Sequence, residues 1–138
     1  MKIVEQELGD AEPHVKAEVL INGDVGGKAM PKKVDKWWGY ELHYKNDEEY
    51  CMKLLCLKQG GHTSMHFHVG KHETLLVTKG TLTLMTISDK VEKTYLVPEG
   101  VAWVVCPGYT HRLKAVHGEV HIVEASTYDR EDDSVRIK

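Results

Sequence analysis

The amino-acid sequence predicts an all-β domain, a sandwich or barrel of short antiparallel strands. Short apolar runs alternate with turn residues at a regular spacing through most of the chain, a pattern typical of such folds. No stretch keeps the apolar repeat of about 3.6 residues that a helix requires, so we expect little helix. At 138 residues the chain is long enough for one domain, residues 1–138, with a real hydrophobic core.

The expected strands follow one another from residue 50 onward. Residues 50–57 are apolar on both faces, which indicates deep burial. A Gly-Gly turn leads into a strand at residues 62–68. Further strands, each bounded by Gly, Pro or Asp turn residues, are expected at 73–78, 81–87, 91–97, 101–105, 111–116 and 119–125.

The two ends of the chain are less regular. Residues 19–21 form a strand candidate that ends at an Asn-Gly-Asp turn. Residues 25–33 are rich in Gly and Lys, which favours a loop. Residues 129–138 begin with a cluster of charges and are expected to form a charged C-terminal tail, either solvated or docked on the barrel.

The overall composition argues against several classes of function. The net charge is -3 and no basic face stands out, so neither nucleic acid nor an anionic membrane is expected as a partner. The N-terminus has no apolar signal core, and no apolar run approaches the ~20 residues of a membrane span. The three cysteines show no disulfide spacing, and we expect a cytoplasmic protein with reduced thiols.

The segment at residues 60–80 carries the strongest functional signal. His66 and His68 are two residues apart, so both point to the same face of a strand. Glu73 can return on the neighbouring strand and face the same way, and His111 follows a later Pro-Gly turn. Three imidazoles and one carboxylate that converge make a divalent-metal site with open positions. These donors suit Fe, Mn, Ni, Co or Zn, and the sequence does not choose among them.

The spacing of these residues resembles the two motifs of the cupin superfamily. Most of the second motif is present, although its proline falls one place late, at Pro107, and its asparagine is replaced by Ala115. The first motif is matched at every fixed position by Gly60, His66, His68, Glu73 and Gly80, and the second by Gly100, Gly108 and His111.

The cupin resemblance covers about residues 36–128 and implies a small double-stranded β-helix, a jelly-roll-like barrel open at one end. Residues 1–35 are then an N-terminal extension. The resemblance also implies that one divalent metal ion is bound by His66, His68, Glu73 and His111.

Within the cupins the chain is similar to the sugar-phosphate isomerase group, above all to the cupin domain of type II mannose-6-phosphate isomerases. A Trp-Gly segment at residues 37–39 opens the similar region, and an acidic-acidic-x-Val-Arg segment at residues 132–136 closes it. That group continues with a Tyr-Gly-Arg segment whose arginine is linked to catalysis, whereas this sequence ends at Lys138.

Three residues are candidates for moving a proton in such a reaction: Lys53, Glu124 and His62. Lys53 lies in an otherwise apolar strand, so its ammonium must reach water or a polar partner in a cavity. His62 shares the strand parity of the two ligand histidines and either lines the same cavity or is a solvated strand-end residue. Arg112 suits an anionic group such as phosphate, but it alternates with His111 and can point outward.

These residues and the resemblance favour a metal-dependent enzyme that acts on a small molecule, a sugar or sugar phosphate, as an aldose–ketose isomerase. The metal would hold the carbonyl and a neighbouring hydroxyl as a Lewis acid and stabilise an enediolate. One alternative is a non-haem metal dioxygenase, and another is a non-catalytic, metal-dependent sugar-binding module. A homodimer is expected, by resemblance and because exposed strand edges need to be covered.

Overall fold

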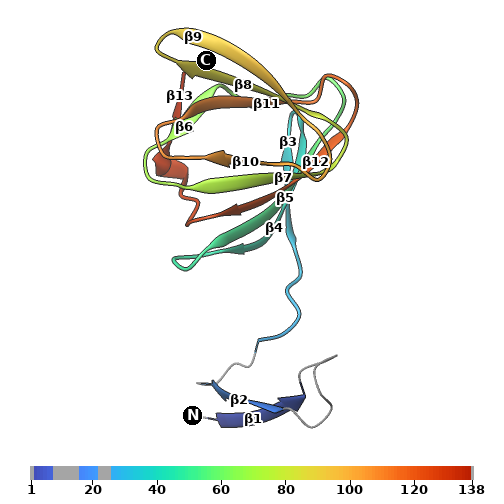
Figure 1. Ribbon diagram of the computed structural model, residues 1–138, viewed down its shortest axis with the longest axis vertical. Coiled ribbons are helices and arrows are strands. Elements are labelled where there is room, and N and C mark those ends of the chain that lie inside the picture. The colour runs from blue at the N-terminus through green and yellow to red at the C-terminus, as the bar shows by residue number, and fades with distance from the viewer. Residues whose placement is uncertain (1, 8–15, 22–25, 138) are drawn as a thin grey trace.

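The computed structural model describes residues 2–7, 16–21 and 26–137 (Figure 1). Its regular structure is almost entirely β-strand, which confirms the predicted fold class. The described residues contain one helical turn, the 3-10 turn η1 at Glu131–Asp133. They include no helix with the length and apolar character needed to span a membrane.

Strands occur throughout the described part of the chain, and the first two, β1 and β2, pair in an antiparallel hairpin. The bounds are β1 Lys2–Glu7, β2 Lys16–Ile21, β3 Lys32–Lys36, β4 Gly39–Asn46, β5 Cys51–Leu57, β6 His66–His68, β7 Glu73–Lys79, β8 Leu82–Ser88, β9 Val91–Val97, β10 Ala102–Val105, β11 Thr110–Lys114, β12 Val120–Ser126 and β13 Ser134–Arg136.

Two antiparallel sheets enclose the core. One has the strand order β10-β7-β12-β5-β4-β3, and the other has the order β13-β6-β11-β8-β9. Figure 1 shows the two sheets as opposed layers, with β8 and β9 over β7 and β5. Apolar side chains from both sheets fill the space between them, among them Leu57, Leu75, Leu84, Leu113 and Ile122.

The inward-facing rows of the larger sheet change from polar to apolar along the strands. In β5 the buried Lys53 is followed by the buried Leu55 and Leu57. In β7 the buried Glu73 precedes Leu75 and Val77 in the same way. Because side chains two residues apart share a face, one half of the barrel interior is an apolar core and the other half is a polar chamber.

Antiparallel pairing brings the polar ends of these rows together. Glu124 of β12 stands opposite Lys53 in the register, and Ser126 stands opposite Glu73. On the facing sheet, His111 of β11 stands opposite His66 of β6. The chamber therefore collects its charged and imidazole side chains from strands far apart in the sequence.

Most expected strands agree with the structure within two residues, and β9 agrees at both ends. The strand expected at 62–68 is an exception, because β6 is restricted to His66–His68 and His62 makes only an isolated bridge to Lys114. The register shifts by one residue between these positions, since His62 stands opposite Lys114 and His66 opposite His111, so the ladder is interrupted.

Four strands were not anticipated, and one of them is β1, which lies in the expected N-terminal extension. β3 begins inside the expected loop at 25–33, of which residue 25 lies outside the described part. β4 is half-buried along most of its length and mixes polar with apolar residues, so its sequence gives no clear alternation. β13 forms from the expected charged tail by pairing with β6, a contact that local sequence cannot reveal.

Candidate metal centre

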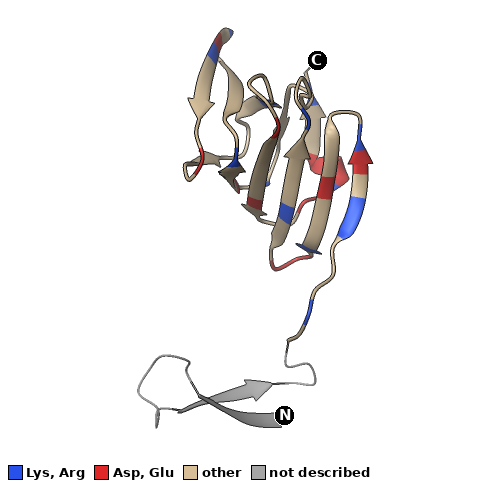
Figure 2. Ribbon diagram, turned by 90° about the vertical axis from the view of Figure 1, so that its right-hand side faces the viewer, with Lys and Arg blue, Asp and Glu red and all other residues tan. Residues whose placement is uncertain are grey.

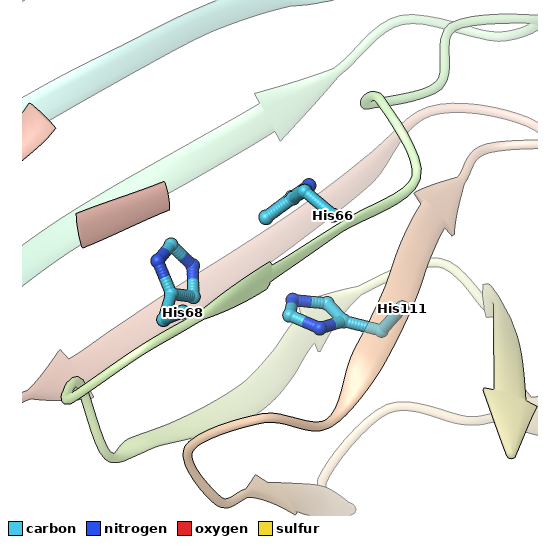
Figure 3. Close-up of side chains that lie close together, drawn as sticks. All are labelled: His66, His68 and His111. Atoms are coloured by element: carbon cyan, nitrogen blue, oxygen red, sulfur yellow. The ribbon is translucent and has the colours of Figure 1, made fainter. Parts of the chain in front are cut away.

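The polar chamber is a cavity of about 950 Å³ between the two sheets. The four residues proposed as ligands all line it: His66, His68, Glu73 and His111. Each of the three histidines places one ring nitrogen within 4.8 Å of a ring nitrogen of the other two (Figure 3). His66 and His68 belong to β6, whereas His111 belongs to β11. The sequence-based grouping of these imidazoles is thus reproduced in the geometry.

The carboxylate of Glu73 lies beside the same cluster. Its Oε2 is 3.4 Å from His68 Nε2, and its Oε1 is 3.8 Å from His111 Nε2. Only 4% of Glu73 is exposed. Three imidazoles and one buried carboxylate are donors that transition-metal ions accept.

Backbone carbonyls fix the tautomer of two of the imidazoles. His66 Nδ1 donates to the carbonyl of Ser64, and His111 Nδ1 donates to the carbonyl of Tyr109, both at 2.8 Å. A carbonyl oxygen only accepts, so the proton sits on Nδ1 in each ring. The lone pair of Nε2 is therefore available, as metal-binding histidines require.

The imidazoles are held in their neutral form. Burial, together with the positive charge of Lys71, lowers the pKa of His68 to about 3. Burial also lowers the pKa of His111, to about 4, with His66 as a second cause. The pKa of His66 is lowered too, mainly by burial. Neutral imidazoles are the form that binds a cation.

Lys71 is a residue of the site that sequence reasoning missed. It is 4% exposed, and its Nζ lies 3.0 Å from Glu73 Oε2, 3.2 Å from Glu124 Oε2 and 3.3 Å from Asp129 Oδ1. Burial alone would lower the pKa of Lys71, but Glu124, Glu73 and Asp129 outweigh it and raise that pKa. Strand parity gives no signal for Lys71, because this residue lies in the loop before β7, which begins at Glu73.

Lys53 occupies the neighbouring part of the cavity and is also charged. Its Nζ donates a hydrogen bond to Asp129 and lies 3.9 Å from Glu41 Oε1. Burial opposes the charge of Lys53, but Glu124 and Asp129 together raise its pKa. The expectation that Lys53 finds a polar partner within a cavity matches its position.

The buried charges around the chamber carry a net negative charge that a cation can balance. Among the charged residues of the lining that are not exposed, four carboxylates (Glu41, Glu73, Glu124, Asp129) and two ammonium groups (Lys53, Lys71) give a formal charge of -2, whereas the exposed ones (Lys32, Lys36, Glu131, Arg136) give +2. Consistent with this excess, burial and then Glu124 raise the pKa of Glu73 to about 7. A divalent cation at the imidazole cluster would neutralise the group, so these residues fit a metal ion.

A second group of possible metal donors, Cys51, Glu124 and Asp129, does not fit a metal. Burial raises the pKa of the Cys51 thiol to about 11, so the sulfur keeps its proton. The space beside the two carboxylates is taken by Lys71, whose Nζ donates to both. We therefore assign the two carboxylates of this group the role of neutralising Lys53 and Lys71.

The other candidate site residues differ in whether they line the cavity. Glu124 lines the cavity, whereas His62 does not: its ring meets Trp37 edge-on at 4.6 Å between centroids, and its Nδ1 lies 3.0 Å from the Thr63 carbonyl. The parity argument for His62 fails because β6 begins only at His66. Arg112 is likewise absent from the cavity lining, while Arg136 of β13 is part of it.

Comparisons with known proteins agree with this architecture. The model of a family described as Cupin matches residues 32–136. None of the curated proteins matches the chain. The fold is similar to that of the capsular polysaccharide assembling protein CapF from Staphylococcus aureus, with a TM-score of 0.70, 14% identity, and coverage of 78% of this chain and 34% of CapF.

A second group of similar structures consists of oxalate decarboxylases. The enzyme from Bacillus subtilis gives a TM-score of 0.71 at 16% identity, with coverage of 84% of this chain and 33% of the enzyme. The enzyme from Lactobacillus farciminis gives 0.70 at 14% identity, with coverage of 84% and 38%. Such identities show the fold alone, and the chain spans about a third of the length of these proteins.

Replacing Asp129 tests whether the buried charges depend on one another. Burial would raise its pKa, but Lys71 and Lys53 lower it to about 2, below the usual value of 3.8. A carboxylate with a lowered pKa stabilises the fold above its unfolded pKa and loses this effect as the pH falls through its folded pKa. We expect Asp129→Asn to cost about 2 kcal/mol in the free energy of unfolding at pH 7, with the difference shrinking below about pH 4.

The measurement is urea unfolding of both proteins at pH 7 and at pH 3. The control is Asp35→Asn, because Asp35 is exposed and its ion pair with Lys33 spans 3.7 Å; such surface pairs contribute about 0–1 kcal/mol. Equal stability of the Asp129 variant and the wild type at pH 7 would show that the lysines do not need this carboxylate.

Proposed function

The chain belongs to the cupin family, and on that premise we propose that it acts on a sugar or sugar phosphate as a metal-dependent aldose–ketose isomerase. The observation that carries the proposal is one cavity that joins two sets of groups. One set is the metal-binding cluster of His66, His68, Glu73 and His111. The other consists of charged side chains suited to hydroxyl groups and to proton transfer, namely Lys53 and Glu124.

A divalent ion held by His66, His68, Glu73 and His111 would supply Lewis-acid polarisation of a substrate carbonyl and its neighbouring hydroxyl, a contribution of several kcal/mol. The remaining chemistry belongs to the protein's own groups. Isomerisation removes a proton from one carbon and returns it to the next, so a base must face both carbons. The transient enediolate carries negative charge that a nearby cation stabilises.

The structure supports different roles for Lys53 and Glu124. Because its pKa is raised, Lys53 stays protonated, so we assign it as a hydrogen-bond donor to substrate oxygens. Glu124 Oε2 accepts hydrogen bonds from Lys71 Nζ at 3.2 Å and from Ser126 Oγ at 3.0 Å, which fixes the orientation of its carboxylate. We assign Glu124 as the base, and we assign no catalytic role to His62, which lies outside the cavity.

A phosphate group is supported by the cations on the exposed part of the cavity wall. Lys32 and Lys36 of β3 and Arg136 of β13 all line the cavity and are exposed. Ammonium and guanidinium groups are the usual phosphate partners. A cavity of about 950 Å³ also has room for a phosphorylated sugar.

Removal of single ligands tests the metal centre. We expect His66→Ala and Glu73→Ala to lower bound metal sharply, because each change deletes one of four donors. The matched control is His121→Ala, since His121 is paired with Glu119 at 2.6 Å and does not line the cavity. Elemental analysis of protein purified without chelators measures the metal content, and unchanged stoichiometry in both ligand variants would contradict the assignment.

The catalytic proposal is tested by Lys53→Met with a panel of sugar phosphates. We expect the variant to keep its metal but to lose at least ~10-fold in kcat/KM, since a hydrogen bond to a charged donor contributes about 1.5–3 kcal/mol. The control is Lys79→Met, because Lys79 is exposed and paired only with Glu119 among the described residues.

Product analysis distinguishes the proposed chemistry from its two alternatives. Interconversion of aldose and ketose without oxygen uptake supports the isomerase. Oxygen uptake coupled to loss of substrate contradicts it in favour of a dioxygenase. Stabilisation by sugar phosphates without turnover contradicts it in favour of a binding module.

We also propose that the chain forms a homodimer through the outer face of the six-stranded sheet, whose central strands carry few charged positions (Figure 2). An uncharged row crosses the sheet in register on this face. Burial of a sheet face of this kind between two copies is a common basis of symmetric dimers. The row consists of Leu42, Leu54, Val123, Leu76 and Ala102.

Sedimentation velocity tests the dimer. The wild type is expected to sediment at about twice the chain mass of 15.6 kDa, and Leu76→Lys is expected to give the monomer because it places a charge in the apolar row. Val91→Lys is the control, since Val91 is an exposed apolar residue of β9 in the other sheet. A monomeric wild type at micromolar concentration would contradict the proposal.

A further inference from the structure

The C-terminal segment, residues 129–136, forms part of the wall of the cavity that holds the candidate metal centre. Asp129, Glu131, Ser134 and Arg136 all line the cavity. The sequence suggests a charged tail that is either solvated or docked, and in the structure the segment is docked. It contacts the candidate metal centre at two separate places, the strand β6 and the loop at residues 69–71.

The first contact supports the strand that carries two of the ligands. β6 is only three residues long and shares a single ladder position with β11, at His66 and His111. On its other edge β13 pairs with all three residues, and His68 stands opposite Ser134. Without β13, the ligand strand would lie at the edge of its sheet with few backbone partners.

The second contact runs through one carboxylate, that of Asp133. Its Oδ1 accepts a hydrogen bond from Gly70 N at 2.8 Å, and its Oδ2 accepts one from Lys71 N at 3.1 Å. The carbonyl of Asp133 also accepts from Val69 N at 2.9 Å. Three successive backbone amides of the loop between β6 and β7 are thus bound by one residue.

This loop determines where Lys71 and Glu73 lie. Lys71 is the last of the three bound residues, and its Nζ is 3.0 Å from Glu73 Oε2. A fixed backbone at residues 69–71 therefore fixes both the cation beside Glu73 and the start of β7, where Glu73 itself stands. The neighbouring Asp132 makes no such contact: its carboxylate pairs with Arg130 at 2.7 Å on the surface.

We propose that Asp133 is a positioning residue of the metal centre, which holds Glu73 and Lys71 in the arrangement that binds the ion. The proposal rests on the metal-binding function proposed above. Asp133 acts through the loop backbone, to which its carboxylate is hydrogen-bonded. Groups hydrogen-bonded directly to metal ligands contribute about 10–100-fold to metal affinity, and we expect the lower end of this range for Asp133, which acts one contact further out.

The test is Co²⁺ binding to the full chain, followed by the visible absorption of the bound ion. Asp133→Ala removes both side-chain acceptors, Asp133→Asn keeps one, and Asp132→Asn changes the adjacent exposed carboxylate. We expect Asp133→Ala to weaken Co²⁺ binding about 10-fold or more and to alter the absorption bands, which report the coordination geometry. Asp133→Asn should show a smaller loss, and Asp132→Asn should bind as the wild type does.

A purely structural role predicts a different result. It would lower the melting temperature of the metal-free protein while the folded variant kept the Co²⁺ affinity and spectrum of the wild type, and that outcome overturns the proposal. If Asp133→Ala does not fold, the same comparison is made between Asp133→Asn and Asp132→Asn, and equal affinities and spectra overturn it. Unaltered Co²⁺ binding by His66→Ala would instead refute the metal site itself, so the two failures are distinguishable.

Discussion

The buried carboxylate of Glu73 is the constraint on which the rest of the site depends. A charged group removed from water is costly unless opposite charges and hydrogen bonds replace the lost hydration. Here the replacement comes from Lys71 at 3.0 Å and, in our proposal, from a divalent ion among the three imidazoles. Lys71 in turn needs Glu124 and Asp129, so one buried charge accounts for most of the polar chamber.

One end of the barrel interior is apolar and the other end holds buried charges. The apolar end supplies the hydrophobic burial that stabilises the two sheets, while the polar end holds charges that are stable only as a group. Alternation along β5 and β7 makes this division possible, because inward positions change from Lys53 and Glu73 to leucine and valine within one strand. The close-packed apolar end can thus hold the polar chamber in shape.

Much of this arrangement could be predicted from local sequence, and the remainder depends on contacts between distant segments. Most strands from residue 51 onward follow from short apolar runs between turn residues, and the shared face of His66 and His68 follows from two-residue alternation. The docking of the C-terminal segment does not, since the three residues of β13 owe their conformation to β6. Lys71 could not be predicted either, because it lies in the loop before β7 and its burial depends on Asp129 and Glu124, which are distant in sequence.

We propose that four side chains from three strands bind a single ion. X-ray absorption spectroscopy at the zinc edge of the Zn²⁺-loaded protein tests this binding. We predict one shell of nitrogen and oxygen at about 2.0–2.1 Å, with the outer scattering of about three imidazole rings. A sulfur shell near 2.3 Å, or scattering without imidazole, would place the ion elsewhere and contradict the claim.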